Sequence, residues 1–390
     1  MLEELLDPKV QEYIQSFTGD ITKLAFAGSP FPNIPTQVLL EQISSREQIK
    51  TKLPTWYKTP NIYYPPKLNL EQTSSEITAR HKAKYIQAEH IADLTGGFGI
   101  DTYYLAQLAK KLTYFEKDEG LSQIAAHNFQ ALAAHNIKVV KGDSLTSLTG
   151  QYDLIYADPA RRNLNKKRVF LLSDCLPDIP SNLNKIFAHT DVLVLKTSPM
   201  LDITQGLKEL QYVGCIHCVA IENEVKELLW FIYSRPIKDE IRLLTFNYTK
   251  DKVQFFESSI EDTSEIEYST PLTYLYEPNA AILKSGGFNI LARDYSIKKL
   301  APHSHLYTSD KKIEFPGRSF KIMKYVSYNK QQMKALKNKK ANVSMRNFTE
   351  SVAQIRKKWK IKEGGLDYLF FTRTEKNSHI VIFCKKIETR

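Results

Sequence analysis

The 390-residue sequence has little of several features that would fix its class at once. It contains only four cysteines, which argues against a disulfide-stabilised secreted domain and fits a reducing cytoplasm. It has no run of 18 apolar residues, and its first residues, MLEELLDPKV, are acidic, so we expect neither a membrane span nor a signal peptide. Internal repeats and low-complexity tracts are also lacking. We therefore expect a cytoplasmic globular protein of two or three domains.

The cysteines give little reason to expect a metal. Cys215 and Cys218 form a CxxC pair, but it lies in the apolar run GCIHCVAI and no second pair stands at a zinc-binding spacing. The pattern is typical of two small buried side chains in a strand. We predict no metal site.

Charge is distributed unevenly along the chain. Residues 301–390 hold 21 lysines and arginines against 7 acids, whereas the first 300 residues hold 33 against 36. A strongly basic C-terminal module on a near-neutral body is typical of a protein that binds a polyanion, most often nucleic acid. A lysine-rich solvated surface would give the same composition without any partner.

From residue 91 onward, short apolar runs alternate with stretches of helical spacing. The runs IADL, LTYFEK, IKVVKGD, YDLIYAD and DVLVLKT predict strands, and their alternation with helices indicates a parallel, doubly wound α/β sheet. The runs CIHCVAIE and ELLWFIYS follow closely on one another and predict an antiparallel hairpin at one edge of the sheet. Short helices are expected before the sheet, and a small basic α+β module after it.

Polar residues gather where the predicted strands end. IADL runs into the loop DLTGGFGID, residues 93–101, whose three glycines let the backbone approach a ligand at a helix start. The spacing is not GxGxxG, so a nicotinamide dinucleotide is disfavoured. The next three strands each end in an acid, at Glu116, Asp143 and Asp158. Ligands of open α/β sheets bind at these carboxyl ends, so we predict a ligand site there, although each acid alone could be a helix N-cap.

The order of these motifs over residues 70–235 resembles that of class I S-adenosylmethionine methyltransferases, whose first motif is acid-x-Gly-x-Gly-x-Gly. The stretches EQTSSEITARHKA, DPARR, YEPNAAILKSG, FPGRSFKI and KANVSMRNF are more similar still to a bacterial group with a ferredoxin-like unit and a THUMP-like C-terminal domain. The resemblance implies an N-terminal helical region at 1–70 and an α/β, Rossmann-like class I methyltransferase sheet at 71–240. It further implies connecting strands with a small ferredoxin-like α+β unit at 241–312, and a basic THUMP-like RNA-binding module at 313–390.

The same resemblance implies S-adenosyl-L-methionine as the cofactor and RNA, either tRNA or rRNA, as the partner. Glu116 would accept from two ribose hydroxyls and Asp143 from the adenine amino group. The full set implied around the cofactor is Asp93, Thr95, Gly96, Gly97, Gly99, Asp101, Glu116, Lys117, Asp143, Ser144 and Asp158, with Ser75 and Thr78 on a helix that closes over it. The basic residues predicted to contact RNA are Arg161, Arg162, Lys196, Arg346, Lys357 and Lys358.

The stretch Asp158-Pro159-Ala160-Arg161 departs from the (Asp/Asn/Ser)-Pro-Pro-aromatic motif of methyltransferases that act on exocyclic base amino groups. Asp158 and the Pro159 carbonyl can still accept from an amino group and orient its lone pair. Arg161 stands where a ring would stack on the base, and a guanidinium can itself stack or bind a phosphate. We predict Asp158, Pro159 and Arg161 as the catalytic residues for methylation of an exocyclic base nitrogen.

Other functions stay open at this point. Lys82, Asp158, Lys196 and Glu227 are a candidate Lys-Asp-Lys-Glu set, as in RNA ribose 2′-O-methyltransferases, where a lysine with a lowered pKa acts as base. The chain could instead be a non-catalytic RNA-binding protein that retains the cofactor fold, or a methyltransferase of proteins or small molecules. A C5-cytosine mechanism is disfavoured because its thiolate candidate, Cys175, lies far past Asp158. The sequence indicates neither the methylated atom nor the oligomeric state.

Overall fold

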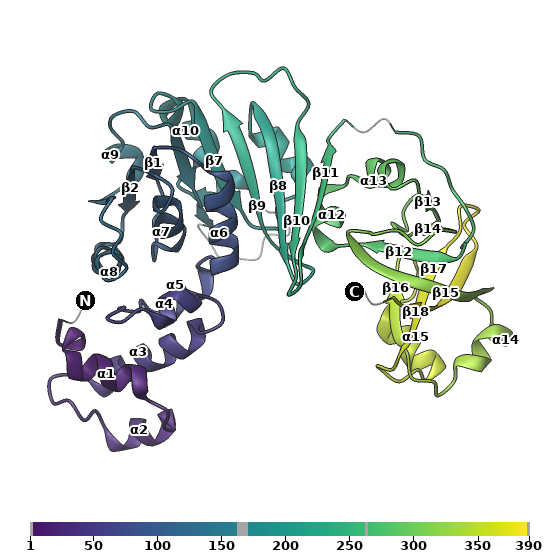
Figure 1. Cartoon of the computed structure of the whole chain (residues 1–390), viewed down its shortest axis with the longest axis horizontal. Coiled ribbons are helices and arrows are strands. Elements are labelled where there is room, and N and C mark those ends of the chain that lie inside the picture. Colours follow the sequence, from purple (N-terminus) through teal and green to yellow (C-terminus); the bar gives the residue numbers. More distant parts are fainter. Residues whose placement is uncertain (1–2, 162–170, 262–263, 388–390) are drawn as a thin grey trace. The chain divides into compact units, whose positions relative to one another are not determined.

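The structure, a computed structural model, describes residues 3–161, 171–261 and 264–387 (Figure 1). The predicted RNA contact Arg162 lies outside these described residues, and the side chain of Arg161 is not described either. The chain divides into two compact units, one of Met1–Gly214 with Leu229–Ile237 and the other of Cys215–Leu228 with Lys238–Arg390.

The first unit begins with a helical region. Its helices are α1 (Pro8–Ser16), α2 (Ile21–Ala27), α3 (Thr36–Ile49), α4 (Pro54–Lys58) and α5 (Lys67–Gln72). Asp7 caps α1 by accepting from the N–H of Lys9, and the following Pro8 suits the first helical position. Trp56 of α4 is fully buried and stacks at a tilt on Phe98, in a core that these helices share with the glycine loop and the helices after it. The helical region therefore supports the loop from behind.

The predicted parallel sheet follows. It contains β1 (His90–Asp93), β2 (Lys111–Glu116), β3 (Ile137–Lys141), β4 (Leu154–Ala157) and β7 (Val192–Thr197), in the order β7-β4-β1-β2-β3. All four pairings among these strands are parallel. The helices of this region are α6 (Glu76–Tyr85), α7 (Ile100–Ala106), α8 (Glu119–Ala131), α9 (Ser144–Ser147), α10 (Ile179–Phe187) and α11 (Ile203–Glu209). The α/β prediction is confirmed, and the carboxyl ends of β1 to β4 meet at one edge because the strands run in parallel.

The hairpin that the sequence predicts as the outermost pair of strands is not outermost in the sheet. Strands β8 (Val213–Ile221) and β9 (Glu224–Tyr233) are followed in the sheet by β10 (Arg242–Tyr248) and β11 (Val253–Ser259), in the order β11-β10-β8-β9-β7. β10 pairs in parallel with β8, and β11 pairs antiparallel with β10. β10 is buried from Leu243 to Asn247, as expected of an internal strand that has neighbours on both sides.

A second sheet fills most of the second unit. It contains β12 (Tyr274–Pro278), β13 (Lys298–Lys299), β14 (Tyr307–Ser309), β15 (Gly317–Ser327), β16 (Asn342–Met345), β17 (Asp367–Arg373) and β18 (His379–Lys386). The strand order is β13-β14-β12-β15-β18-β17-β16. Short helices α12 (Ala280–Ser285), α13 (Phe288–Asp294) and α14 (Lys330–Met333) and the longer α15 (Val352–Trp359) accompany it. The α+β part and the basic module predicted from the sequence thus share one sheet.

Among the described residues, no helix is long and apolar enough to cross a bilayer. Nor do three His, Cys, Asp or Glu side chains come together there in a way that would hold a metal ion.

Candidate active site

A cleft of about 570 Å³ lies at the carboxyl ends of the parallel strands in the first unit. Its volume is typical of sites for cofactors and other small molecules. The wall includes most of the residues that the sequence singled out: Asp93, Thr95, Gly96, Gly97, Asp101, Glu116, Lys117, Asp143, Ser144, Asp158 and Lys196. It also includes residues that the sequence did not assign to a site, among them Asn69, Gln72, Thr73, Tyr156, Leu176 and Pro177.

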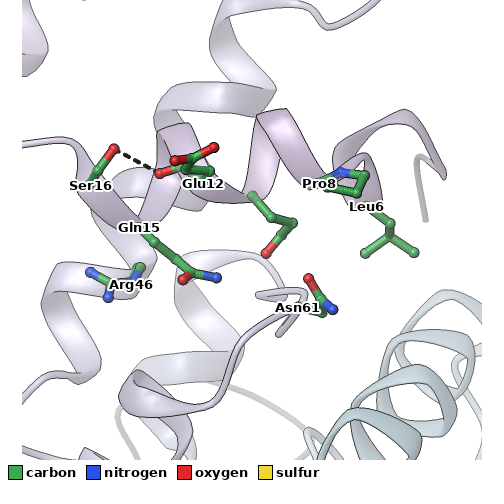
Figure 2. A pocket seen from close by; sticks show the side chains of 8 residues that line it. Leu6, Pro8, Glu12, Gln15, Ser16, Arg46 and Asn61 are labelled. Carbon is green, nitrogen blue, oxygen red and sulfur yellow. Dashed lines mark hydrogen bonds between the residues drawn. The ribbon is translucent and has the colours of Figure 1, made fainter.

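Figure 2 shows a different concavity, of about 500 Å³, among the N-terminal helices. Several of its polar groups already serve the helices themselves. Ser16 donates to the Glu12 carbonyl oxygen, and the guanidinium of Arg46 lies 3.9 Å from the centre of the Tyr57 ring. It contains neither the glycine loop nor the strand-end acids, so the candidate active site is the cleft at the sheet edge.

The glycines of the loop are required by close packing and by backbone conformation. A Cβ on Gly96 would lie 2.0 Å from the ring of Tyr114, and one on Gly99 would lie 2.6 Å from the ring of Phe129. Gly97 and Gly99 have φ values of 56° and 88°, in the left-handed region. The Tyr114 hydroxyl donates to the Gly97 carbonyl oxygen over 2.6 Å. The loop is therefore packed against Tyr114 of β2, and Gly96 and Gly97 line the cleft.

Two strand-end acids differ in what they already bind. Both oxygens of Glu116 accept backbone N–H groups, from Gly97 at 2.9 Å and from Asp118 at 2.7 Å. This fixes the carboxylate at the cleft wall, and its remaining lone pairs can accept ribose hydroxyls. Asp143 caps α9 by accepting from the N–H of Thr146, so it is a helix cap and a part of the cleft wall at once.

Replacement of Glu116 is expected to weaken cofactor binding. A charged hydrogen bond contributes about 1.5–3 kcal/mol, so Glu116→Gln should raise the Kd for S-adenosylmethionine roughly 10- to 150-fold in calorimetric titrations. Glu119→Gln is the matched control, because Glu119 sits on the nearby surface with a side chain 72% exposed. Equal affinities in the two variants would contradict the assignment.

A chain of hydrogen bonds links the glycine loop to the end of β4. Asp93 accepts from the N–H of Thr95 at 2.9 Å and from the hydroxyl of Thr102 at 2.6 Å. The Thr95 hydroxyl in turn accepts from the N–H of Asp158 at 2.6 Å. Thr95, predicted as a cofactor contact, therefore also sets the position of Asp158. Burial raises the pKa of Asp93 to about 7, against the two hydrogen bonds that favour its ionised form.

This raised pKa predicts a pH-dependent stability. Between the ordinary carboxyl pKa and about 7, folded Asp93 holds a proton that the unfolded chain has released. Protonated Asp93 therefore stabilises the folded state fully below about pH 4, and this stabilisation is lost as the pH rises through about 7. In urea titrations between pH 5 and 8, the free energy of unfolding should fall more steeply for the wild type than for Asp93→Asn. Parallel pH profiles would contradict this.

Asp101 is the centre of a polar network at the wall of the cleft. Its Oδ2 accepts from the Tyr156 hydroxyl at 2.7 Å and from the Ser74 hydroxyl at 2.8 Å, and its Oδ1 lies 3.2 Å from Nζ of the fully buried Lys82. Burial alone would raise the pKa of Asp101. The charges of Lys82 and Lys196, with the two hydrogen bonds, bring this pKa below its ordinary value instead. The network joins α6, α7 and β4.

Sequence reasoning missed Ser74 and Tyr156 as members of this network. Tyr156 precedes Asp158 by two residues, so strand alternation could have placed both on one face. The resemblance implied Ser74, together with Ser75 and Thr78, on a segment that closes over the cofactor, and Ser74 does line the cleft. Ser75 instead caps α6 by accepting from the N–H of Thr78, and neither Ser75 nor Thr78 lines the cleft.

Asp158 itself forms an ion pair with a lysine side chain. Lys196, at the end of β7, lies 2.5 Å from Oδ2 of Asp158, and both side chains line the cleft. Pro159 does not line it. Beyond Pro159, the backbone of Ala160–Arg161 forms β5, which pairs antiparallel with β6 (Cys175–Leu176). The structure thus brings Asp158 and Lys196 together, as the ribose 2′-O alternative requires. Its other members, Lys82 and Glu227, are both buried, and Glu227 belongs to the second unit.

The three basic residues predicted to contact RNA from the second unit differ in their surroundings. Arg346 lies 2.7 Å from Oε1 of the buried Glu277. Lys358 binds both oxygens of Glu350 at 3.0 Å and the hydroxyl of Tyr328 at 3.1 Å. Lys357 is exposed. Two of these side chains therefore hold the module together, whatever else they contact.

Comparisons with known proteins agree with this architecture. Residues 68–178 match a family model described as ribosomal RNA adenine dimethylase, residues 274–316 one described as a ferredoxin-like domain, and residues 317–386 one described as THUMP domain-like. The crystal structure of a methyltransferase candidate from Porphyromonas gingivalis W83 is 29% identical, with a TM-score of 0.89 over 99% of both chains. Two uncharacterized S-adenosylmethionine-dependent methyltransferases of Mycobacterium tuberculosis, from strains CDC 1551 and H37Rv, are 28% identical over 162 residues.

The fold, the glycine loop and the strand-end acids are those of class I methyltransferases, whose methyl donor is S-adenosylmethionine. Beyond this part, residues 274–316 and 317–386 are similar to ferredoxin-like and THUMP-like domains, and the whole chain has the fold of the P. gingivalis methyltransferase candidate. The match covers 41% of this chain and 44% of the M. tuberculosis relatives, so the chain spans less than half of their length.

Proposed function

We propose that the protein transfers a methyl group from S-adenosylmethionine to an exocyclic amino nitrogen of a base in RNA, tRNA or rRNA, in the cytoplasm. The observation that carries this proposal is the position of Asp158. Its carboxylate stands at the end of β4 inside the cleft, with its backbone N–H fixed by Thr95. The likeness of residues 68–178 to ribosomal RNA adenine dimethylases supports an amino group as the target.

The chemistry asks little of the protein beyond placement. The bound cofactor supplies an electrophilic methyl group on sulfur. Asp158 accepts an N–H of the target amino group and thereby directs the nitrogen lone pair away from itself, toward the methyl group. As the new N–C bond forms and the methyl–sulfur bond breaks, the nitrogen releases one proton, for which Asp158 is the acceptor at hand. Lys196 holds the carboxylate in place at 2.5 Å.

A second candidate reaction is methylation of a ribose 2′-hydroxyl. The Lys196–Asp158 pair favours it, because a lysine beside a carboxylate is a possible base for a hydroxyl. Against it, Lys82 is fully buried and bound to Asp101, so it does not reach a substrate in this arrangement.

Transfer of labelled methyl from S-adenosylmethionine to RNA lacking the modification tests both reactions. The RNA should come from cells without the gene, and it should be digested to nucleosides after reaction. Label on a base amino group supports the proposal, whereas label on ribose supports the second candidate. Binding of the cofactor without label in either tRNA or rRNA would refute an RNA acceptor.

RNA contacts in the THUMP-like domain are expected at a lysine cluster. We use this name for Lys334, Lys337, Lys339, Lys340, Lys360 and Lys362, all of which are exposed. Two backbone hydrogen bonds hold their segments together, from the N–H of Lys362 to the Lys339 oxygen and from the N–H of Ala341 to the Lys362 oxygen. Within the described part of the chain, no ion pair involves these six side chains. Their charge is thus available to phosphates.

We predict that loss of this charge lowers RNA affinity and its salt dependence. With Lys337, Lys339 and Lys340 changed to Gln, the slope of log K against log salt in filter-binding titrations of tRNA should decrease by about 2–3. A variant with Lys9, Lys23 and Lys58 changed to Gln carries the same net charge and is the control, because these exposed lysines lie in the N-terminal helices. Equal slopes would rule out the lysine cluster as a phosphate-binding surface.

A further inference from the structure

The part of the cleft around Asp158 has an apolar wall beside its charged pair. β5 and β6 pair with Ala160 opposite Leu176, which brings a segment from beyond residue 170 next to the catalytic stretch. Leu176 and Pro177 line the same cleft as Asp158 and Lys196. The Leu176 side chain is 53% exposed, which makes it an apolar surface on the cleft wall.

This apolar wall could supply the stacking surface that the Asp-Pro-Ala-Arg stretch lacks. Amino methyltransferases with an aromatic residue after Asp-Pro-Pro stack that ring on the base, and here the motif supplies no ring. A nucleobase has flat apolar faces and a polar edge. In the cleft, a leucine and a proline can contact the flat face of a base, and a carboxylate and an ammonium can bind its polar edge.

The charged pair also distinguishes between bases. Lys196 lies beside Oδ2 of Asp158, so the pair offers an acceptor and a donor next to one another. Adenine and cytosine present the complement, an amino N–H beside an unprotonated ring nitrogen. On its Watson–Crick edge, guanine presents its amino group beside the ring N1–H, which would oppose the ammonium, and only its N3 side offers an unprotonated nitrogen next to that group. Uracil has no amino group.

We propose that Leu176 and Pro177 form the face on which the target base lies, and that Asp158 with Lys196 reads an adenine or cytosine edge. This inference rests on the proposed methylation of RNA and names the acceptor within it. In this arrangement Asp158 accepts the amino N–H, and Lys196 donates to the neighbouring ring nitrogen. Lys196 is then a specificity-determining residue as well as a partner that positions Asp158.

A fluorescent reporter tests the base-binding face without requiring turnover. Leu176→Trp places an indole on the face, and Leu108→Trp is the matched control, since Leu108 is 55% exposed in the same unit and does not line the cleft. Both variants are titrated, with the cofactor site filled by S-adenosylhomocysteine, with short oligouridine strands that carry one central A, C or G. Unchanged circular dichroism and S-adenosylhomocysteine affinity show that each variant is folded.

In the Leu176→Trp variant, strands that carry A or C should quench the fluorescence of the introduced indole. Half-maximal quenching should need a concentration about tenfold or more lower than for strands that carry G or only U. The same strands should leave the fluorescence of the control variant unaffected. In a Lys196→Met background the preference for A or C should shrink severalfold. Equal quenching in both variants would overturn the base-binding face, and a preference for G would overturn the edge recognition. If quenching shows the A or C preference while the wild type transfers no methyl to any RNA, the proposed activity fails and the base site stands.

Discussion

Asp158→Asn should reduce methyl transfer to RNA by about 10²- to 10³-fold, the size of effect seen when one preorganised polar group at a reacting centre is removed. The asparagine amide keeps the shape of the side chain. It loses the charge that pairs with Lys196 and the capacity to take up a proton. Steady-state rates with labelled S-adenosylmethionine measure the effect, at saturating RNA so that the change falls in kcat.

Cofactor affinity decides what such a loss means. In the proposed reaction Asp158 binds the acceptor and not the cofactor. The Kd for S-adenosylmethionine should therefore change by no more than about threefold, which is a change of less than about 1 kcal/mol in binding free energy. Asp202→Asn is a suitable control, because Asp202 is the N-cap of α11 in the same unit and does not line the cleft. A loss of cofactor binding that parallels the loss of rate would move Asp158 to the cofactor site. An unchanged rate would exclude it from catalysis.

The largest effect on stability is expected at the Asp101 network in the cleft wall. Asp101→Ala takes a carboxylate away from Lys82, whose side chain has no exposed surface. Removal of one partner from a buried ion pair costs about 3–5 kcal/mol, because the other charge stays in a poorly solvated place. Urea unfolding should therefore show a loss of this size, together with weaker cofactor binding, since Asp101 lines the cleft.

A pair of equal length on the surface provides the comparison. Lys141 and Glu119 are also 3.2 Å apart, but their side chains are 54% and 72% exposed, so Glu119→Ala should change the free energy of unfolding by less than about 1 kcal/mol. The double variant Asp101→Ala/Lys82→Met should recover part of the loss caused by Asp101→Ala alone, because it leaves no buried ammonium. Strict additivity of the two single changes would contradict a direct Asp101–Lys82 interaction.

Much of the candidate cofactor site could be predicted from the sequence, because it depends on features local to each strand end. The Asp93–Asp101 loop, Glu116 and Asp143 follow strands that are recognisable by their apolar runs, and parallel pairing then brings them to one edge. The edge position of the final hairpin could not be read in this way. Whether β8 and β9 end a sheet depends on β10, whose parallel pairing with β8 joins residues distant in the chain and has no local signature.

The sequence by itself determined the class of fold and the carboxylate at the end of β4, since periodicity, glycine spacing and strand-end acids are properties of short segments. Its resemblance to class I methyltransferases indicated the methyl donor. Only the tertiary structure decided how the charges are used. In the folded protein, ion pairs join Asp101 to Lys82, Asp158 to Lys196 and Arg346 to Glu277. The tertiary structure also brought Leu176 opposite Ala160. The physical reason is that ion pairing and burial depend on distances in space, and residues as far apart in the chain as 158 and 196 come within contact only once the sheet has formed.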